Sequence, residues 1–200
     1  MYIPHFRGKC INRFGISNST GTFPRENNMT TPSTYLGMSL SIDDLDVENK
    51  EYFRHCSTHQ FHLQSCVACK LLRYTPGTAC PWCGTLESQW MPVEGKGAVH
   101  SYTEVRHVVQ PGFKPHSPYL VLLVDLDTQK GKPSEHESLR IVGNLVDAEG
   151  KLATPEVVKT VGIGTRVRMV FTDIEPGISL PQWTIDEQAK QPEKVWRFPQ

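Results

Sequence analysis

The chain has 200 residues, of which 38% are hydrophobic and 21% are charged, so it can bury one sizeable core with a small appended unit. Its 21 Lys and Arg balance its 21 Asp and Glu, which disfavours a nucleic-acid binder, because such proteins carry clustered positive charge. No apolar run is long enough to span a membrane and residues 1–30 lack the pattern of a secretory signal, so we expect a cytoplasmic protein.

The first forty residues are expected to form a disordered extension. Residues 1–40 are rich in Asn, Ser, Thr, Gly and Pro, and they show neither helical nor strand periodicity. Met29 stands directly before TTPSTYLGMSLSIDDLD, so translation from Met29 is an alternative to translation from Met1. The sequence leaves both starts open.

A helical segment is predicted over residues 41–64. The run SIDDLDVENKEYFRHC carries acidic residues early, and Leu45, Tyr52 and Phe53 follow at helical spacing. This pattern indicates one amphipathic helix, capped by Ser41 or Asp43.

Residues 65–90 contain two Cys-x-x-Cys pairs. Cys66 and Cys69 form the first pair, Cys80 and Cys83 form the second, and ten residues with turn-forming Pro and Gly separate them. Tetrahedral zinc takes four thiolate donors, and a two-residue gap lets both sulfurs of one tight turn reach the same ion. Thioredoxin-like redox chemistry would need one pair in a βαβ setting, which this pattern lacks. We therefore predict a rubredoxin-like zinc ribbon whose closed shell of four cysteines is structural.

Residues 91–185 have the sequence pattern of several short β-strands. AVHSYTEVRHVV alternates apolar and polar residues, PYLVLLVDLD is apolar on both faces, and the strands RIVGNLV and TRVRMVFTDI flank the helix or turn TPEVVKTV. One helical interruption before the penultimate strand is typical of a small, closed Greek-key barrel of the OB type. The predicted fold class is therefore mainly β, and residues 186–200 are expected to be a flexible tail.

Several other histidines and cysteines are weaker candidates for a site. His55 and His59 lie one helical turn apart with His62 nearby, but no Glu follows His55 as in a metalloprotease helix. We interpret these histidines as a solvated helix face. Cys10 and Cys56 have no partner at a useful spacing and are interpreted as free thiols.

The first predicted barrel strand leaves two functions open. His100, Tyr102 and Arg106 share one of its faces, where an OB groove could stack single-stranded nucleic acid. The same residues could form a protein interface, which the neutral charge favours. No Ser, Cys or Lys nucleophile stands in a recognisable motif with a base, and phosphate-binding Gly-rich motifs are absent from the sequence.

The chain resembles a known family over about residues 45–185. In order, it carries Leu63-Gln64, the double Cys-x-x-Cys ribbon, Trp90, EGKGAVHSYTEV, PYLVLLVDLD, RIVGNLVD, VGIGTRVRMVF and LPQW. This colinear series closely resembles the acyl-CoA-associated zinc-ribbon/OB-fold proteins called domain of unknown function 35.

The resemblance implies a non-catalytic accessory subunit of a thiolase-superfamily enzyme. Members of the family bridge or complete thiolases, hydroxymethylglutaryl-CoA synthases, lipid-transfer-type aldolases and some hydratases, and they help hold the CoA part of the substrate. The implied partner is a thiolase-fold or lipid-transfer-type acyl-CoA enzyme subunit, which would carry out the Claisen or retro-Claisen step. The implied cofactor is structural Zn²⁺, with a CoA thioester as ligand of the complex.

Two positions depart from the family pattern. Lys70 stands where the family commonly has Gly after its second cysteine, although Gly84 keeps this feature in the second turn. The Arg that often follows the aromatic-Pro step between the pairs is also missing. We expect contacts with CoA phosphate and pantetheine to fall to Lys70, Arg73 and Tyr74.

Overall fold

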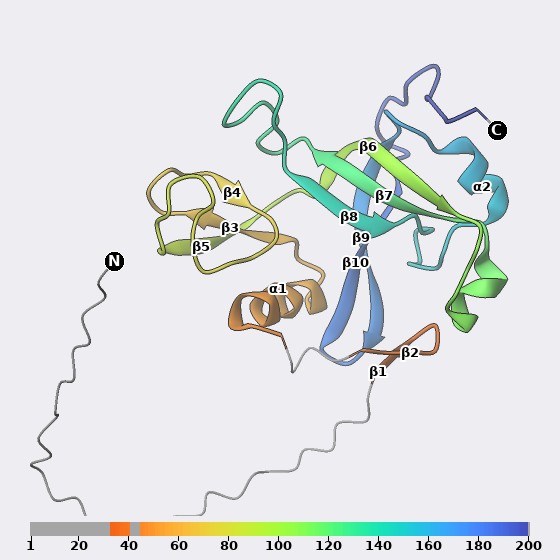
Figure 1. Ribbon diagram of the computed structural model, residues 1–200, viewed down its shortest axis with the longest axis horizontal. Coiled ribbons are helices and arrows are strands. Elements are labelled where there is room, and N and C mark those ends of the chain that lie inside the picture. The colour runs from red at the N-terminus through yellow and green to blue at the C-terminus, as the bar shows by residue number, and fades with distance from the viewer. Residues whose placement is uncertain (1–32, 41–44, 200) are drawn as a thin grey trace, which may run out of the picture. The chain divides into compact units, whose positions relative to one another are not determined.

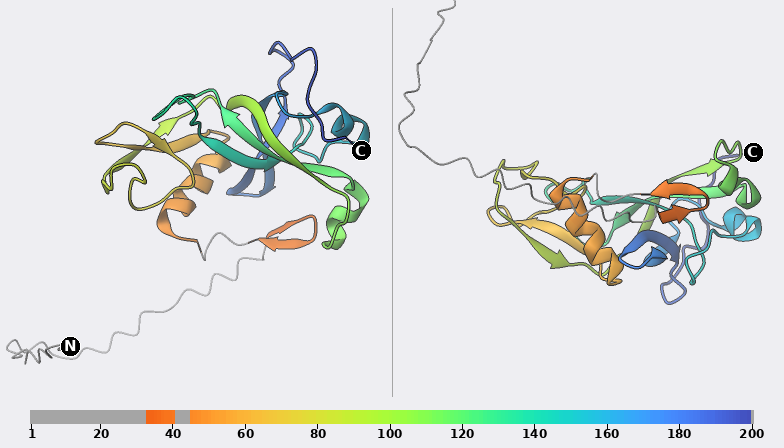
Figure 2. Two further views of the ribbon diagram at one scale, coloured as in Figure 1. Left: turned by 45° about the horizontal axis from the view of Figure 1, so that its top comes forward. Right: turned by 90° about the horizontal axis from the view of Figure 1, so that it is seen from below.

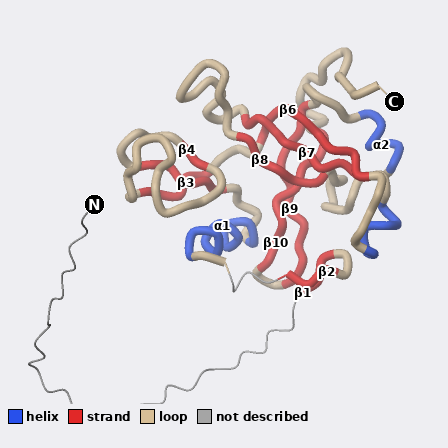
Figure 3. The backbone as a smooth tube through the Cα atoms, in the orientation of Figure 1, coloured by secondary structure: helices blue, strands red, loops and turns tan. Residues whose placement is uncertain are grey.

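The computed structural model describes residues 33–40 and 45–199, and most of this chain is strand and loop (Figures 1 and 3). Residues 1–32 of the expected extension lie outside the described residues. Residues 33–40 form a β-hairpin of β1 (Ser33–Tyr35) and β2 (Met38–Leu40) instead of the predicted disorder. The hairpin is ordered because the buried Tyr35 ring packs edge-on against Phe113, with ring centroids 5.8 Å apart. Strand β1 also contacts β9 (Arg166–Glu175) (Figure 2).

The predicted helix is α1 (Val47–Ser57), and it begins later than expected. Its N-cap is Asp46, whose Oδ1 accepts a hydrogen bond from the backbone N–H of Asn49 at 2.7 Å. The proposed caps at positions 41 and 43 lie outside the described residues. Tyr52 and Cys56 on this helix are buried in the main hydrophobic core.

The cysteine-containing segment forms a three-stranded antiparallel sheet in the order β4-β3-β5. Its strands are β3 (His62–Cys66), β4 (Leu72–Arg73) and β5 (Ser88–Pro92). Leu63 on β3 is fully buried in the same core as Tyr52 of α1 and Trp183 of β10 (Ile178–Ile185). This shared core joins the small sheet to the helix and to the larger sheet.

The larger sheet has five antiparallel strands in the order β10-β9-β6-β7-β8. The remaining strands are β6 (Lys96–Val105), β7 (Tyr119–Leu126) and β8 (Arg140–Asn144). A 3-10 helix, η1 (Pro111–His116), connects β6 to β7, and α2 (Pro155–Thr160) lies between β8 and β9. The OB strand order and the helix before the penultimate strand confirm the predicted fold class.

The prediction of a closed barrel was wrong in one respect, because no continuous ladder joins β8 to β10. These strands meet beyond the end of β8, through one parallel bridge between Leu145 and Trp183. The fully buried Trp183 indole lies against Gly143 of β8, where an added Cβ would be 2.9 Å from the indole Cδ1. The Trp183 ring therefore packs against the backbone of β8 close to the place where β8 and β10 approach each other.

The expected flexible tail is packed on the fold through residue 199. The backbone groups of Trp196 and Ile163 form an antiparallel bridge, with N···O distances of 2.9 and 3.3 Å. Arg197 Nη1 donates to the carbonyls of Val158, at 2.7 Å, and Val161 at the end of α2. Among the described helices, none has the length and apolar character needed to cross a membrane.

Candidate functional site

The four cysteines of the two Cys-x-x-Cys pairs lie together at one end of the ribbon. Their sulfur atoms are all within 4.8 Å of one another. Cys66 Sγ lies 3.5 Å from Cys83 Sγ, and Cys69 Sγ lies 3.6 Å from Cys80 Sγ, so each close contact joins one pair to the other. These distances exceed a disulfide bond of about 2.05 Å by a wide margin.

The spacing of the sulfurs matches the geometry of tetrahedral zinc. Zn–S bonds of about 2.3 Å place the sulfurs of such a site about 3.8 Å apart. A hydrogen bond with the Thr85 hydroxyl, followed by one with the Thr85 backbone, lowers the pKa of Cys83 to about 6. The backbone hydrogen bond of Cys69 with Leu71 lowers its pKa, but burial and the neighbouring cysteine sulfurs outweigh that bond and raise the pKa of Cys69 to about 12, so the sulfur spacing is the evidence for a metal site. The cluster can therefore hold a metal ion such as zinc.

The backbone turns that hold the two pairs have the same form. Lys70 and Gly84, each directly after the second cysteine of its pair, have φ of 62° and 75°. Lys70 N–H donates to the Cys66 carbonyl at 3.0 Å, and Gly84 N–H donates to the Cys80 carbonyl at 2.9 Å. Lys70 therefore adopts the left-handed conformation expected of glycine, and the first turn keeps the same form as the second.

The three residues considered for CoA contact do not form one exposed surface. Lys70 is exposed, Tyr74 is half-buried beside the core, and Arg73 is only 3% exposed. Arg73 Nε donates to Gln64 Oε1 at 2.9 Å, and its Nη2 donates to the Gly77 carbonyl at 2.6 Å. The Arg73 guanidinium thus holds the loop between the cysteine pairs.

The histidines near α1 form two separate contacts. The rings of His55 and His62 stack with centroids 4.1 Å apart. His59 Nε2 lies 2.7 Å from Asp173 Oδ1, which also accepts a hydrogen bond from Ser179 Oγ at 2.6 Å. The carboxylate lies between the imidazole and the hydroxyl, so this cluster lacks the serine-to-histidine hydrogen bond of a catalytic triad.

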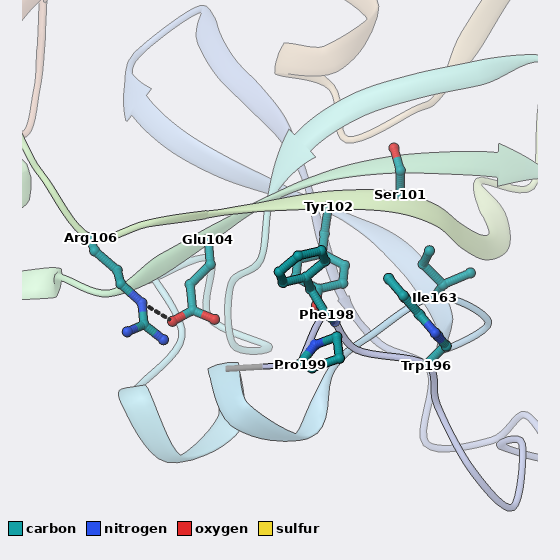
Figure 4. A pocket seen from close by; sticks show the side chains of 8 residues that line it. All are labelled: Ser101, Tyr102, Glu104, Arg106, Ile163, Trp196, Phe198 and Pro199. Atoms are coloured by element: carbon teal, nitrogen blue, oxygen red, sulfur yellow. Dashed lines mark hydrogen bonds and ion pairs between the residues drawn. The ribbon is translucent and has the colours of Figure 1, made fainter.

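A pocket of about 580 Å³ lies where β6 meets the C-terminal segment (Figure 4). Its lining residues are Ser101, Tyr102, Glu104, Arg106, Ile163, Trp196, Phe198 and Pro199. Sequence reasoning identified Tyr102 and Arg106 as a shared face but missed the pocket. The aromatic residues of the segment VWRFP were the available signal, since such residues are unusual in a loose tail.

Comparisons with known proteins agree with this architecture. Residues 90–172 match the family described as "ChsH2, C-terminal OB-fold domain". A solved structure described as "Ltp2-ChsH2(DUF35) aldolase" contains a chain that is 30% identical, with a TM-score of 0.56. The similarity covers 71% of the present chain and 97% of that chain. The chain belongs to the DUF35 family. The resemblance noted in the sequence is thereby confirmed.

Two further relatives of this DUF35 chain differ more from it, one in length and the other in sequence. A "Probable enoyl-CoA hydratase alpha subunit" of Thermomonospora curvata is 31% identical over 134 residues, which are 67% of the present chain. The DUF35 chain spans 36% of the length of that relative. A DUF35 protein of Sulfolobus solfataricus is 13% identical with a TM-score of 0.46, and the similarity covers 70% of the present chain and 86% of that one.

Proposed function

We propose that this DUF35 chain is a non-catalytic accessory subunit of an acyl-CoA enzyme, and that it assembles with a thiolase-like or aldolase partner chain. The observation that carries this proposal is the 30% identity over 97% of a ChsH2(DUF35) chain described as part of an aldolase. The name of the Thermomonospora curvata relative also refers to a subunit of an acyl-CoA enzyme. In this assignment the partner supplies the reacting groups.

The cysteine cluster has a structural role in this proposal. Cys66, Cys69, Cys80 and Cys83 provide four donors, which completes a tetrahedral zinc shell and leaves no position for substrate. Zinc bound there fixes the ribbon, and the ribbon shares its core with α1 and the OB sheet. Loss of the metal would therefore disturb the surfaces used for assembly.

The accessory chain also helps to hold the CoA substrate in this proposal. Much of the binding energy of a CoA thioester comes from its nucleotide and pantetheine, which are remote from the reacting carbons. A second subunit can use that part to position the thioester without taking part in the bond-making step. Lys70 is the exposed cation of the three candidates and would make the contact with CoA, whereas Arg73 is buried and Tyr74 is half-buried.

Co-purification from the native host tests the assembly. The full-length chain, tagged and expressed at its normal level, should retain one acyl-CoA enzyme subunit in a fixed ratio through size exclusion at moderate salt. The isolated chain should show no turnover of acyl-CoA. Recovery of the chain free of any acyl-CoA enzyme, or acyl-CoA turnover by the chain alone, would contradict the proposal.

A further inference from the structure

The second half of β6 has one edge without a neighbouring strand in the described part of the chain. Strand β6 pairs with β7 as far as Val105, but its pairing with β9 covers only Lys96–Ala98. Two further backbone hydrogen bonds involve Val99. Its N–H donates to the Thr165 carbonyl at 2.9 Å, and its carbonyl accepts from the Gly164 N–H at 2.8 Å. Beyond Val99, the backbone on this side of β6 has no strand partner among the described residues.

The alternation of hydrogen bonds identifies which backbone groups face this edge. Leu120 of β7 accepts a bond from Leu145, on the side of β8, so the residues one position away along β7 face β6. The same alternation along β7 makes Val121 and Leu123 face β6, where Val121 is opposite Thr103 and Leu123 is opposite Ser101. The amides and carbonyls of Tyr102 and Glu104 therefore point to the open edge.

The pocket described above lies along this same half of β6 (Figure 4). Its outer wall is apolar and accessible, because Trp196 is 54% exposed and Phe198 is 73% exposed. The bridge to Ile163 and the bonds of Arg197 hold this wall in place. An exposed aromatic surface beside a free strand edge is typical of a protein-recognition site.

The charges at the pocket favour an acidic group on the bound segment. Glu104 accepts hydrogen bonds from Arg106 Nε at 2.9 Å and from Arg197 Nη2 at 2.7 Å. Two guanidinium groups thus share one carboxylate, which leaves one positive charge in excess. The Arg106 side chain is 62% exposed and is the cation that an incoming carboxylate can reach.

We propose that an extended segment of the partner acyl-CoA enzyme subunit adds as a strand to the edge of β6 at Tyr102 and Glu104. An apolar side chain of that segment occupies the pocket beside Trp196, and a carboxylate lies against Arg106. This inference rests on the proposed function and names the surface through which the assembly forms. Main-chain hydrogen bonds supply affinity and the two side-chain contacts supply specificity.

Amide hydrogen exchange at single-residue resolution tests the strand addition. The measurement uses the full-length chain with the acyl-CoA enzyme subunit that co-purifies with it. Binding should slow exchange at the amides of Tyr102 and Glu104 by at least about tenfold, and it should change Ser101 and Thr103 little, since these already face β7. This alternation distinguishes strand pairing from general coverage of the surface.

Variants test the side-chain contacts in the same complex. Trp196→Ala and Arg106→Glu should each raise the dissociation constant at least about tenfold, because exposed Trp and Arg are common interface anchors. Trp82→Ala, at an exposed Trp of the ribbon, is the matched control and should have a smaller effect. Thermal unfolding of each variant alone verifies that the fold is retained.

The outcomes separate this inference from the proposed function. A complex that forms with unchanged exchange at Tyr102 and Glu104 would overturn the docking site and leave the accessory role intact. Protection of these amides in the concentrated chain alone, or by acyl-CoA alone, would also overturn it, because the occupant would be a second copy or a small ligand. Absence of any complex with an acyl-CoA enzyme would overturn both.

Discussion

Arg73 and Gln64 form a buried hydrogen bond of 2.9 Å inside the ribbon, between Arg73 Nε and Gln64 Oε1. The same Gln64 oxygen accepts a bond from the Gly77 amide at 2.8 Å. One side-chain amide thus connects β3, β4 and the loop that leads to the second cysteine pair. This network makes Arg73 a structural residue of the ribbon. Its guanidinium is buried and bonded to Gln64 and Gly77, so it is not placed on the surface where it could contact a phosphate.

Replacing Arg73 by Ala should therefore lower the stability of the chain. The variant removes one of the two donors to the Gln64 oxygen and the Arg73 donor to the Gly77 carbonyl. Hydrogen bonds to charged groups are worth about 1.5–3 kcal/mol. We expect a fall of about 2 kcal/mol in the free energy of unfolding, measured with urea. Lys70→Ala, at an exposed position, should change it by less than about 0.5 kcal/mol. Equal effects of the two substitutions would contradict the structural role of Arg73.

The purified chain should contain one zinc ion, held by the four clustered cysteines. Structural zinc in small fingers contributes about 10–16 kcal/mol of apparent binding free energy, so Cys66→Ser or Cys83→Ser should release the metal and unfold the ribbon. Metal analysis and circular dichroism measure the two effects. Cys56→Ala removes a buried thiol outside the cluster and should retain the full zinc content. Metal-free chain with unchanged stability would disprove the assignment.

Substitutions at the two left-handed positions, Lys70 and Gly84, should change the free energy of unfolding in different directions. Gly84→Ala places a Cβ at φ of 75° and should lower the free energy of unfolding by about 1 kcal/mol, although no atom lies within 4 Å of that Cβ. Lys70→Gly relieves the same conformation at φ of 62° and should be neutral or slightly stabilising. Thermal unfolding of the zinc-loaded chain compares the two. Destabilisation by Lys70→Gly as large as that by Gly84→Ala would show that the turns differ.

The stacked pair of His55 and His62 should make stability depend on pH. Burial, followed by the His62 charge, lowers the pKa of His55, so the folded chain favours the neutral imidazole. This contribution to stability is complete above the ordinary pKa of about 6.5 and is lost as the pH falls through the lowered value. Unfolding by urea should therefore become easier below about pH 6.5.

Nuclear magnetic resonance titration of the His55 ring tests the cause of that shift. His62→Leu removes the neighbouring charge and should raise the pKa of His55 toward its ordinary value. Glu51→Gln should lower it further, because Glu51 Oε1 lies 3.5 Å from His55 Nε2 and opposes the shift, whereas Arg54 adds to it. A pKa of His55 that is unaffected by both substitutions would reject this explanation.

The sequence was most informative where the signal is local. The spacing of the four cysteines and the runs of strand-forming residues depend on neighbouring residues, and the structure contains both the cysteine cluster and the strands of the larger sheet. The hairpin of residues 33–40 and the ordered tail depend on distant partners, since Tyr35 packs on Phe113 and Arg197 binds Glu104. Composition alone made these segments look disordered, because it does not reveal what a single aromatic or Arg side chain contacts.

The same reason explains the remaining differences. From the sequence, Arg73 is expected to be an exposed cation. It is buried because β4 pairs with β3, which places Arg73 beside Gln64. The packing of the buried Trp183 ring of β10 against Gly143 of β8 likewise depends on residues far apart in the sequence. Neither contact has a periodic signature in the chain.

Reconstitution of acyl-CoA turnover tests the accessory role most directly. The partner subunit that co-purifies with this chain should be prepared alone and together with it, and cleavage or hydration of acyl-CoA should be measured at equal partner concentration. We predict that the partner alone is insoluble or at least about tenfold less active, and that adding the zinc-loaded chain restores turnover. Full activity of the soluble partner without this chain would contradict the account.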